Sequence, residues 1–211
     1  MSYSNFTLNS VLKQFHLTLK DKQNLFTDTS DITPSEYLTT TLNYNLPLAS
    51  EINTEKSRSE MIIAPILLEV RRLVTDRISL FSGREFNVEP EQGLNGACDF
   101  LLSLSESQLI IDAPVLIIVE AKKDDIIGGL GQCIATLVAA QKFNQQEQKN
   151  LETIYGAVTS GTAWRFIKLE GNIAYVDSVE YYINQREKIL GILVSMITSL
   201  LSQEERENGL Q

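Results

Sequence analysis

The chain has 211 residues, of which 43% are hydrophobic, and it lacks a linker rich in glycine, serine or proline, so we expect one α/β domain rather than two. A formal net charge of −9 argues against nucleic-acid binding over the whole surface, because nucleic-acid binders commonly present a basic face. We find no apolar segment of membrane-spanning length, no signal sequence and too few cysteines for a disulfide framework, so the sequence predicts a cytoplasmic protein with buried, reduced thiols.

Residues 1–50 are expected to form an N-terminal helical arm. Apolar residues at helical spacing predict one helix near 7–19, and a second is predicted over 34–44, with Thr33 as its N-cap and Glu36 as the capping-box acid. Neither segment carries catalytic residue types in a recognisable spacing. The arm either covers the sheet or mediates dimerisation, and covering is the default expectation.

The next predicted element is a helix over 57–74, where apolar residues recur on one helical face. Pro65 should kink this helix, because proline removes a backbone hydrogen bond and its ring clashes with the preceding turn. Ser57 and Glu60 fit a capping box, in which the glutamate satisfies a free amide at the helix start. The core domain, which we place at 51–203, therefore begins with an amphipathic helix packed against a sheet.

Two strands are predicted to follow this helix. The first covers 78–89 with a turn near 82–84, and a loop at 91–96 leads into the second, an apolar run over 96–104 that contains a single acid, Asp99. Isolated carboxylates are rarely buried without a partner, because their desolvation is costly. Asp99 is therefore expected to have a companion.

The run 114–122 is short, continuous and rich in β-branched residues, which predicts a strand buried on both faces. It ends in Glu120 and Lys122, which point to one side of the strand, while Ala121 points to the other. The polar segment before this run allows a hairpin with the preceding strand, which would set Glu120 beside Asp99. Taken alone, Glu120 and Lys122 could equally form an ordinary ion pair where a core strand reaches the surface.

A helix is predicted over 126–143, with Asp125 as its N-cap. Its glycine-rich start follows a strand, as a phosphate-binding loop would, but it has neither the Walker A pattern nor the third glycine of a dinucleotide fingerprint. These glycines are instead expected to let the helix approach the sheet closely. Gln132, near the start of the helix, is either an accessory site residue or an ordinary surface amide.

The remaining chain is predicted to complete the sheet and cover it. Strands over 153–160 and 163–170 form a hairpin, and 173–176 adds a short edge strand. A helix over 185–202 carries a long apolar stripe, which is either part of the core or the seam of a dimer. Residues 204–211 form a polar tail.

Asp99, followed by Glu120-Ala121-Lys122 at the end of an apolar strand, resembles the motif of the PD-(D/E)XK nuclease superfamily. The resemblance covers roughly 57–169, and 155–166 looks like the strand-turn-strand that follows the catalytic core in nuclease domains of type I restriction enzymes. Ala97-Cys98 stand where the superfamily usually has a proline before the aspartate. The resemblance implies an α/β protein with a restriction-endonuclease-like fold, which is a three-layer α/β/α core with a central mixed β-sheet, to which the helical arm is added.

The same resemblance implies a site for Mg²⁺ or Mn²⁺. Asp99 and Glu120 would supply carboxylate oxygens, and Ala121 would supply its backbone carbonyl oxygen. In relatives a glutamate of the first helix often joins the metal site, which makes Glu60 a further candidate ligand beside its capping role. Mg²⁺ prefers hard oxygen ligands and needs only one or two carboxylates in addition to water and substrate phosphate.

Lys122 and Gln132 complete the expected catalytic set beside the two acids. The ammonium of Lys122 would orient the nucleophile or stabilise charge in the transition state. Several families of the superfamily carry a glutamine near the site, and the RecB-like form has a tyrosine four residues later, where this chain has Thr136. The single histidine, His16, lies outside the predicted core, which excludes a Ser-His-Asp triad, an HNH-type nuclease and a multi-histidine metal centre.

These expectations combine in a Mg²⁺-dependent, endonuclease-like hydrolase of nucleic acid, with DNA the expected substrate. The alternative is a binding or regulatory module that keeps the fold without turnover. A cleft ringed by lysine and arginine would favour the nuclease, and an acidic or closed pocket would favour the module. The basic residues expected to border the cleft are Lys56, Arg58, Lys122, Lys123, Arg165 and Lys168. We also expect a homodimer, allow for a protein partner and expect no membrane association.

Overall fold

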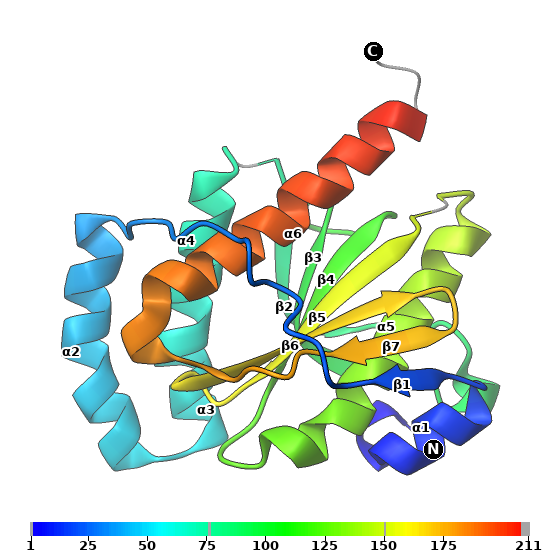
Figure 1. Ribbon diagram of the computed structural model, residues 1–211, viewed down its shortest axis with the longest axis horizontal. Coiled ribbons are helices and arrows are strands. Elements are labelled where there is room, and N and C mark those ends of the chain that lie inside the picture. The colour runs from blue at the N-terminus through cyan, green and yellow to red at the C-terminus, as the bar shows by residue number, and fades with distance from the viewer. Residues whose placement is uncertain (1, 76, 150, 208–211) are drawn as a thin grey trace.

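The computed structural model describes residues 2–75, 77–149 and 151–207 and shows an α/β fold built on one open, mixed sheet (Figure 1). The strands lie in the order β1-β7-β6-β5-β4-β3-β2, and β8 pairs with β6 outside this row. Their bounds are β1 (Thr18–Lys20), β2 (Ser79–Glu85), β3 (Ala97–Ser103), β4 (Val115–Ala121), β5 (Thr153–Thr159), β6 (Ala163–Glu170), β7 (Ile173–Val176) and β8 (Tyr181–Tyr182).

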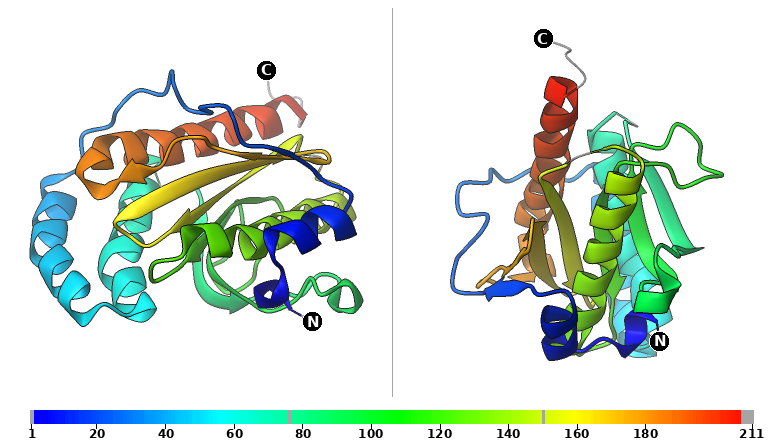
Figure 2. Two further views of the ribbon diagram at one scale, coloured as in Figure 1. Left: turned by 60° about the horizontal axis from the view of Figure 1, so that its bottom comes forward. Right: turned by 90° about the vertical axis from the view of Figure 1, so that its right-hand side faces the viewer.

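Helices cover both faces of the sheet, which gives three layers (Figure 2). The left view shows α6 on one side of the sheet and α5 with α1 on the other. The helical segments are α1 (Leu8–Gln14), α2 (Glu36–Ile52), α3 (Glu55–Arg58), the π-helical turn η2 (Ser59–Ile63), α4 (Ala64–Leu73), α5 (Ile126–Gln146) and α6 (Arg186–Glu207). The short 3₁₀ turns are η1 (Tyr3–Asn5), η3 (Pro90–Gln92) and η4 (Ile183–Gln185).

Two apolar clusters fill the spaces between the layers. The first lies between the sheet and helices α2, α4 and α6, and it buries Trp164, Phe166 and Phe100. The second lies between the sheet and helices α5 and α1, where Leu137 packs near Ile118 within one cluster. Every residue of β4 is buried, so the prediction of a strand covered on both faces is confirmed.

The predicted hairpin of the Asp99 and Glu120 strands is also confirmed. β3 and β4 are antiparallel neighbours, with Phe100 opposite Val119. β4 then pairs in parallel with β5, and β5 pairs antiparallel with β6, so the sheet is mixed. Because Asp99 lies near the start of β3 and Glu120 near the end of β4, the hairpin brings both acids to one end of the sheet.

The first 50 residues contain a strand as well as helices. β1 pairs in parallel with β7 and extends the sheet, and α1 packs beside α5. α2 begins at Glu36 with Ser35 as its N-cap, where the Ser35 hydroxyl accepts a hydrogen bond from the Leu38 N–H at 3.1 Å. Thr33 is not the cap, because the carboxylate of Glu69 accepts hydrogen bonds from the N–H and hydroxyl of Ser35, at 2.8 and 3.0 Å, and holds Ser35 in place.

The helix predicted over 57–74 begins earlier than expected and is not uniform. Thr54 and Ser57 form the capping box of α3, in which each hydroxyl accepts a hydrogen bond from the other residue's N–H, at 3.0 and 3.2 Å. The π-helical turn follows, directly before the first turn of α4, which contains Pro65. A proline lacks the N–H of a regular helix, and the wider turn accommodates that loss. Glu60 therefore does not cap the helix and lies in the π-helical turn instead.

β2 runs through 82–84, where the sequence predicted a turn. Gly83 has a φ of 63°, in the left-handed region that glycine adopts without steric cost. Pairing with β3 continues on both sides of it, with Ser82 opposite Phe100 and Arg84 opposite the residue before Asp99. The glycine therefore marks a local irregularity of the strand and not a reversal of the chain.

The two longest apolar helices belong to the core. α5 has 21 residues and is long and apolar enough to cross a membrane, but 67% of its most apolar window is buried inside the protein. This differs from the expectation that no segment has such length, and the burial identifies α5 as the core helix of a folded domain. The apolar stripe of α6, which includes Ile189 and Leu193, is buried in the chain's own core, as one of the two interpretations predicted. α6 reaches Glu207, and the rest of the expected tail, 208–211, lies outside the described residues.

Candidate metal and catalytic site

Asp99 and Glu120 meet at the end of the β3–β4 hairpin. Extending the Phe100–Val119 register by one residue places the two acids opposite each other on adjacent strands. The backbone N–H of Ala121 donates a hydrogen bond to Oδ2 of Asp99 at 2.8 Å, which fixes this carboxylate against the end of β4. The structure therefore brings together the two acids that the sequence predicted to converge.

Lys122 forms an ion pair with Glu120 at the end of β4. Its Nζ lies 2.6 Å from Oε1 of Glu120, whose side chain is only 2% exposed, while the Lys122 side chain is 22% exposed. The backbone N–H of Lys122 donates to the carbonyl of Thr159 at 2.8 Å, so the chain stays aligned with β5 for one residue beyond β4. The ammonium is therefore held between a buried carboxylate and the protein surface.

The electrostatics of this pair are those of a crowded acidic site. Burial raises the pKa of Glu120 to about 8, the charge of Asp99 and a hydrogen bond between the two carboxyl groups raise it too, and Lys122 opposes them. Burial lowers the pKa of Lys122, but the neighbouring acids, Glu120 first, outweigh burial and leave that pKa above its ordinary value. The lysine is therefore charged at neutral pH, and the buried acid takes up a proton far more readily than an exposed glutamate does.

Gln132 reaches the same ion pair from α5. Its Oε1 accepts a hydrogen bond from Nζ of Lys122 at 3.3 Å, so the accessory residue predicted from sequence lies at the site. Gly129 permits this approach, because a Cβ there would lie 2.7 Å from Cγ1 of Val158 and 3.0 Å from Cγ of Lys122. The prediction that these glycines allow close packing of helix and sheet is confirmed for Gly129, whereas a Cβ at Gly131 would meet the backbone of residues 6–8 instead.

A pocket of about 350 Å³ opens in front of Asp99. Its walls come from α3, the π-helical turn, β2 and the ends of β3 and β4. The lining residues are Glu55, Lys56, Ser59, Glu60, Ser82, Gly83, Asp99 and Ala121. Glu60 thus shares a pocket with Asp99, although its carboxylate is 62% exposed and lies 3.8 Å from the ammonium of Lys56. Glu120 is not part of this lining and is buried.

Two features of the pocket were not predicted from the sequence. Glu55 lines it from the first turn of α3, directly after the N-cap Thr54. The sequence predicted this cap three residues later, at Ser57. Gly83 lines it from β2, and a glycine inside a strand was the available signal, since such glycines often mark a close approach of backbone to a ligand.

The expected ring of basic residues is not formed around the pocket. Lys56 faces it together with three acids, Glu55, Glu60 and Asp99. The guanidinium of Arg58 is instead engaged by the carbonyl of Ser160, the hydroxyl of Thr162 and the amide oxygen of Asn53. Arg165 pairs with Glu180 at 3.2 Å, and Lys168 pairs with Glu170 at 2.9 Å. Without a bound cation, the pocket carries more negative than positive charge.

The site offers the type of ligand that a hard divalent cation prefers, which is oxygen. Asp99 and Glu120 supply two carboxyl groups on adjacent strands, and Ala121, the residue after Glu120, lines the pocket with Asp99. No group of three or more metal-binding side chains exists among the described residues, so the remaining positions would fall to backbone, water and substrate. Cys98 and Cys133 are buried free thiols, as expected, and thiols are not the ligands that Mg²⁺ prefers.

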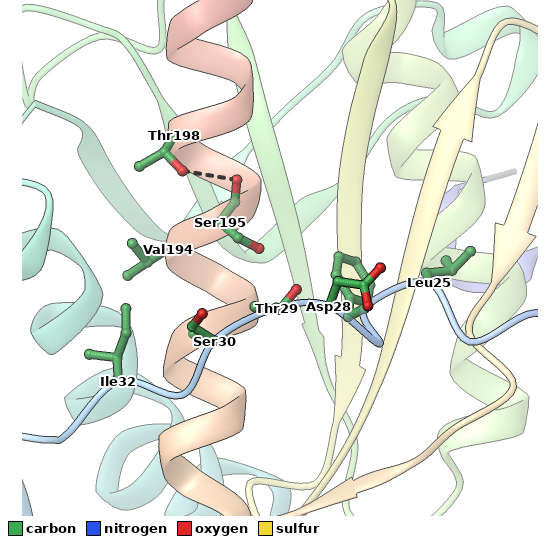
Figure 3. Close-up of a pocket in the computed structure, with 10 residues that line it drawn as sticks. Leu25, Asp28, Thr29, Ser30, Ile32, Val194, Ser195 and Thr198 are labelled. Atoms are coloured by element: carbon green, nitrogen blue, oxygen red, sulfur yellow. Dashed lines mark hydrogen bonds between the residues drawn. The ribbon is translucent and has the colours of Figure 1, made fainter.

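A larger pocket, of about 480 Å³, lies between α6 and the strap formed by residues 25–32 (Figure 3). Asp28 is the only titratable residue in its lining, and hydroxyl groups such as those of Ser195 and Thr198 lie on the α6 side. No second acid, base or nucleophile converges there within the described lining. This pocket is therefore a weaker candidate for catalysis than the smaller one beside Asp99.

Comparison with family models, with curated proteins and with solved structures finds no match for this chain. The function is therefore inferred from the geometry of Asp99, Glu120, Lys122 and Gln132 and of the residues around them.

Proposed function

We propose that the protein is a phosphodiester hydrolase that cleaves nucleic acid with Mg²⁺ or Mn²⁺, and that its fold is restriction-endonuclease-like. The observation that carries this proposal is the buried Glu120, which contacts Lys122 at 2.6 Å and lies opposite Asp99 on the adjacent strand. Asp99 lines the pocket, while Glu120 and Lys122 lie next to it at the end of the adjacent strand, and together they have the chemistry of the resembled motif. DNA is the substrate that the resemblance favours.

Each residue has a distinct task in this proposal. Asp99 and Glu120 would hold the cation, with the backbone carbonyl of Ala121 as a further ligand and Glu60 able to reach it from the opposite pocket wall. The bound cation would supply a water of lowered pKa and offset charge on the phosphate. Lys122 donates to the attacking or departing oxygen, and its charge matches the charge that develops there. Gln132 keeps the Lys122 ammonium oriented through the 3.3 Å hydrogen bond.

The acidic pocket is compatible with this task once a cation is included. Glu55, Glu60 and Asp99 repel phosphate, so a free nucleic acid gains little from the site alone. A divalent cation held by Asp99 and Glu120 would offset the local negative charge and so favour phosphate binding. We therefore expect both substrate binding and turnover to depend on the metal.

The second candidate is a binding or regulatory module without turnover. The acidic lining of the pocket and the 2% exposure of Glu120 favour it, because a substrate cannot contact a carboxylate that is closed off. In that case Glu120 and Lys122 form a structural ion pair. The pair would then respond to protons and not to divalent cations.

A cleavage assay separates the two functions. The parent protein is incubated with single-stranded, double-stranded and branched nucleic acids, with Mg²⁺, with Mn²⁺ and with a chelator. We expect cleavage that needs the metal and that is lost in Glu120→Gln and Lys122→Ala. Glu51→Gln, an exposed substitution on α2 outside the pocket lining, is the charge-matched control. Absence of cleavage for every substrate and metal would favour the module.

Self-association and location remain proposals. We propose a homodimer that uses α2, because Tyr37 and Tyr44 on this helix are 76% and 78% exposed, while the apolar stripe of α6 is already buried. A further protein partner could supply basic surface that the pocket lacks. The protein is a folded domain with a buried core, and we propose that it acts in the cytoplasm.

A further inference from the structure

Arg58 differs from the other basic residues that were expected to border the site. Each of the others forms an ion pair with an acid. These pairs are Lys56–Glu60, Lys122–Glu120, Lys123–Asp124, Arg165–Glu180 and Lys168–Glu170. Within the described part of the chain, the guanidinium of Arg58 contacts only neutral oxygens. Its positive charge is therefore not offset by an acid of the protein.

The neutral contacts fix the orientation of this guanidinium. Nη1 of Arg58 donates to the carbonyl oxygen of Ser160 and to Oγ1 of Thr162, both at 3.1 Å. Nη2 and Nε donate to Oδ1 of Asn53, at 3.2 and 3.4 Å. A guanidinium has five N–H donors, and these contacts use one on Nε, two on Nη1 and one on Nη2. One N–H of Nη2 therefore has no acceptor among the described residues.

The turn between β5 and β6, which holds Arg58, lies next to the proposed site. The carbonyl oxygen of Thr159, the residue before Ser160, accepts a hydrogen bond from the backbone N–H of Lys122 at 2.8 Å. β5 is the direct neighbour of β4, and adjacent strands lie about 4.8 Å apart. α3, which ends at Arg58, also lines the pocket beside Asp99. Arg58 is thus at the same end of the sheet as the proposed cation site.

The chemistry around Arg58 suits the oxygens of a phosphate group. Arg58 is half-buried, and such a charge costs stability unless an anion pairs with it. A planar guanidinium forms strong, charge-assisted hydrogen bonds with phosphate oxygens. The hydroxyl groups of Ser160 and Thr162 lie 3.2 Å apart, and the hydrogen bond between them uses only one of their two protons. The other proton is available to the same anion.

We propose, on the basis of the proposed function, that Arg58 binds a phosphate of the nucleic-acid strand that flanks the phosphate at the cation site. The contact is to the backbone of the nucleic acid and not to its bases, so it carries no sequence preference. It supplies a positive charge beside a pocket that is otherwise acidic. Arg58 is in this role a substrate-binding residue that holds the strand in position.

The salt dependence of nucleic-acid binding tests this contact without turnover. The affinity of the intact protein for short fluorescent single strands and duplexes is measured by anisotropy in Ca²⁺, which also binds carboxylate oxygens, over a series of KCl concentrations. A gel checks that the nucleic acid stays intact. Each phosphate contact contributes about 0.7–0.9 to the slope of log K against log salt. We expect Arg58→Gln to lower this slope by about 1 and to weaken binding about five- to tenfold at about 0.1 M salt.

Asn53→Asp tests the same charge without removing a hydrogen bond. The aspartate keeps the acceptor for Nε and Nη2 of Arg58 and adds the counter-charge that the guanidinium lacks. It should lower the slope as Arg58→Gln does, whereas a purely structural contact would not respond. Lys13→Gln is the control, since it changes the net charge by the same amount at an exposed position of α1, on the opposite face of the sheet from α6 (Figure 2). This variant should bind like the parent, and melting temperatures check that each protein is folded.

The outcomes separate this contact from the proposed function. If the parent binds and cleaves, an unchanged slope in Asn53→Asp and in folded Arg58→Gln would overturn the Arg58 contact alone. An equal loss of slope in Lys13→Gln would also overturn it, because the effect would then be one of net charge. Binding that depends on Arg58 in a parent that never cleaves would support the contact and overturn turnover. A parent that binds no nucleic acid would overturn both proposals.

Discussion

The ammonium of Lys122 lies 2.6 Å from Oε1 of Glu120, and neither residue lines the pocket in front of Asp99. Glu120 is therefore an acid that is buried, paired with one cation and close to a second acid. A structural ion pair and a metal site make different predictions about such a group. The ion pair needs its lysine for stability, whereas the metal site is strained without a divalent cation.

The first prediction concerns the stability of the parent protein with divalent cations. Millimolar Mn²⁺ should raise the melting temperature, because a ligand that binds only the folded state stabilises it, by about 2.7 kcal/mol when present at one hundred times its dissociation constant. Glu120→Gln should abolish this gain, since it removes a carboxylate of the proposed site. The measurement is a pair of melting curves for each protein. A parent whose transition does not move with Mn²⁺ would leave the binding module as the better interpretation.

The second prediction separates Lys122 from the metal ligands. Lys122→Ala should keep the Mn²⁺-dependent rise in melting temperature, or increase it, because the substitution removes a cation that competes for Glu120. The same variant should lose cleavage, typically by a factor of about 10² to 10³, since charge in the transition state is no longer matched. Single-turnover cleavage and melting curves on one preparation provide both readouts. Retained cleavage in this variant would exclude a catalytic role for Lys122.

The convergence of Asp99 and Glu120 could be predicted because it depends on local patterns. An apolar run with one embedded acid, a short polar connection and a second apolar run specify a hairpin, and antiparallel pairing fixes which residues meet. Gln132 was a candidate through the motif resemblance alone, and its contact with Lys122 depends on Gly129, which lets α5 pack close to the sheet.

The pocket wall opposite Asp99 could not be predicted in the same way. The spacing of Ser57 and Glu60 predicted a capping box, whereas in the structure Thr54 is the cap and Ser57 is its partner. The choice of Thr54 moves Glu55 into the first turn of α3, and the π-helical turn before Pro65 sets where Glu60 lies. A sequence period cannot reveal a π-helical turn, because the inserted residue shifts the helical register locally.

The third prediction concerns Gly129, which lets α5 pack close to the site. A Cβ at this position would lie 2.7 Å from Val158 and 3.0 Å from the Lys122 side chain, so Gly129→Ala forces the helix away from the sheet. We expect a loss of about 1–3 kcal/mol in the free energy of unfolding, as for other overpacked cores, together with reduced cleavage. Urea unfolding gives the stability. Ile127→Ala is the control, because that side chain is 60% exposed on the same helix, and it should change little.

The fourth prediction concerns Glu69, which fixes the start of α2. Its buried carboxylate accepts hydrogen bonds from the N–H and hydroxyl of Ser35, and Arg72 donates to it as well. Glu69→Ala leaves the Ser35 N–H without its acceptor, so we expect a loss of about 1–3 kcal/mol in the free energy of unfolding. Mn²⁺ should still raise the melting temperature of this variant, because Glu69 does not line the pocket. Loss of the Mn²⁺ response would link the helical arm to the site.

The fifth prediction is the pH dependence that Glu120 imposes on stability. Burial raises the pKa of Glu120 from its ordinary value of 4.5 to about 8 in the folded state. Below pH 4.5 both the folded and unfolded states carry the proton, so the stabilisation from protonated Glu120 is fully present. Between these two values only the folded state keeps the proton, and the free energy of unfolding falls as pH rises, by at most about 1.4 kcal/mol per pH unit.

Glu120→Gln isolates this contribution, because the amide resembles the protonated acid and does not titrate. Without metal, the stability difference between variant and parent should grow from about pH 5 to about pH 8 and then level off. Saturating Mn²⁺ should suppress the slope in the parent, since a bound cation holds the carboxylate in its charged form. Urea unfolding of both proteins across this range, with a chelator and then with Mn²⁺, measures the two effects. Parallel stability curves for parent and variant in the chelator would show that Glu120 does not keep its proton in the folded state. A slope that persists unchanged in Mn²⁺ would place the cation elsewhere in the protein.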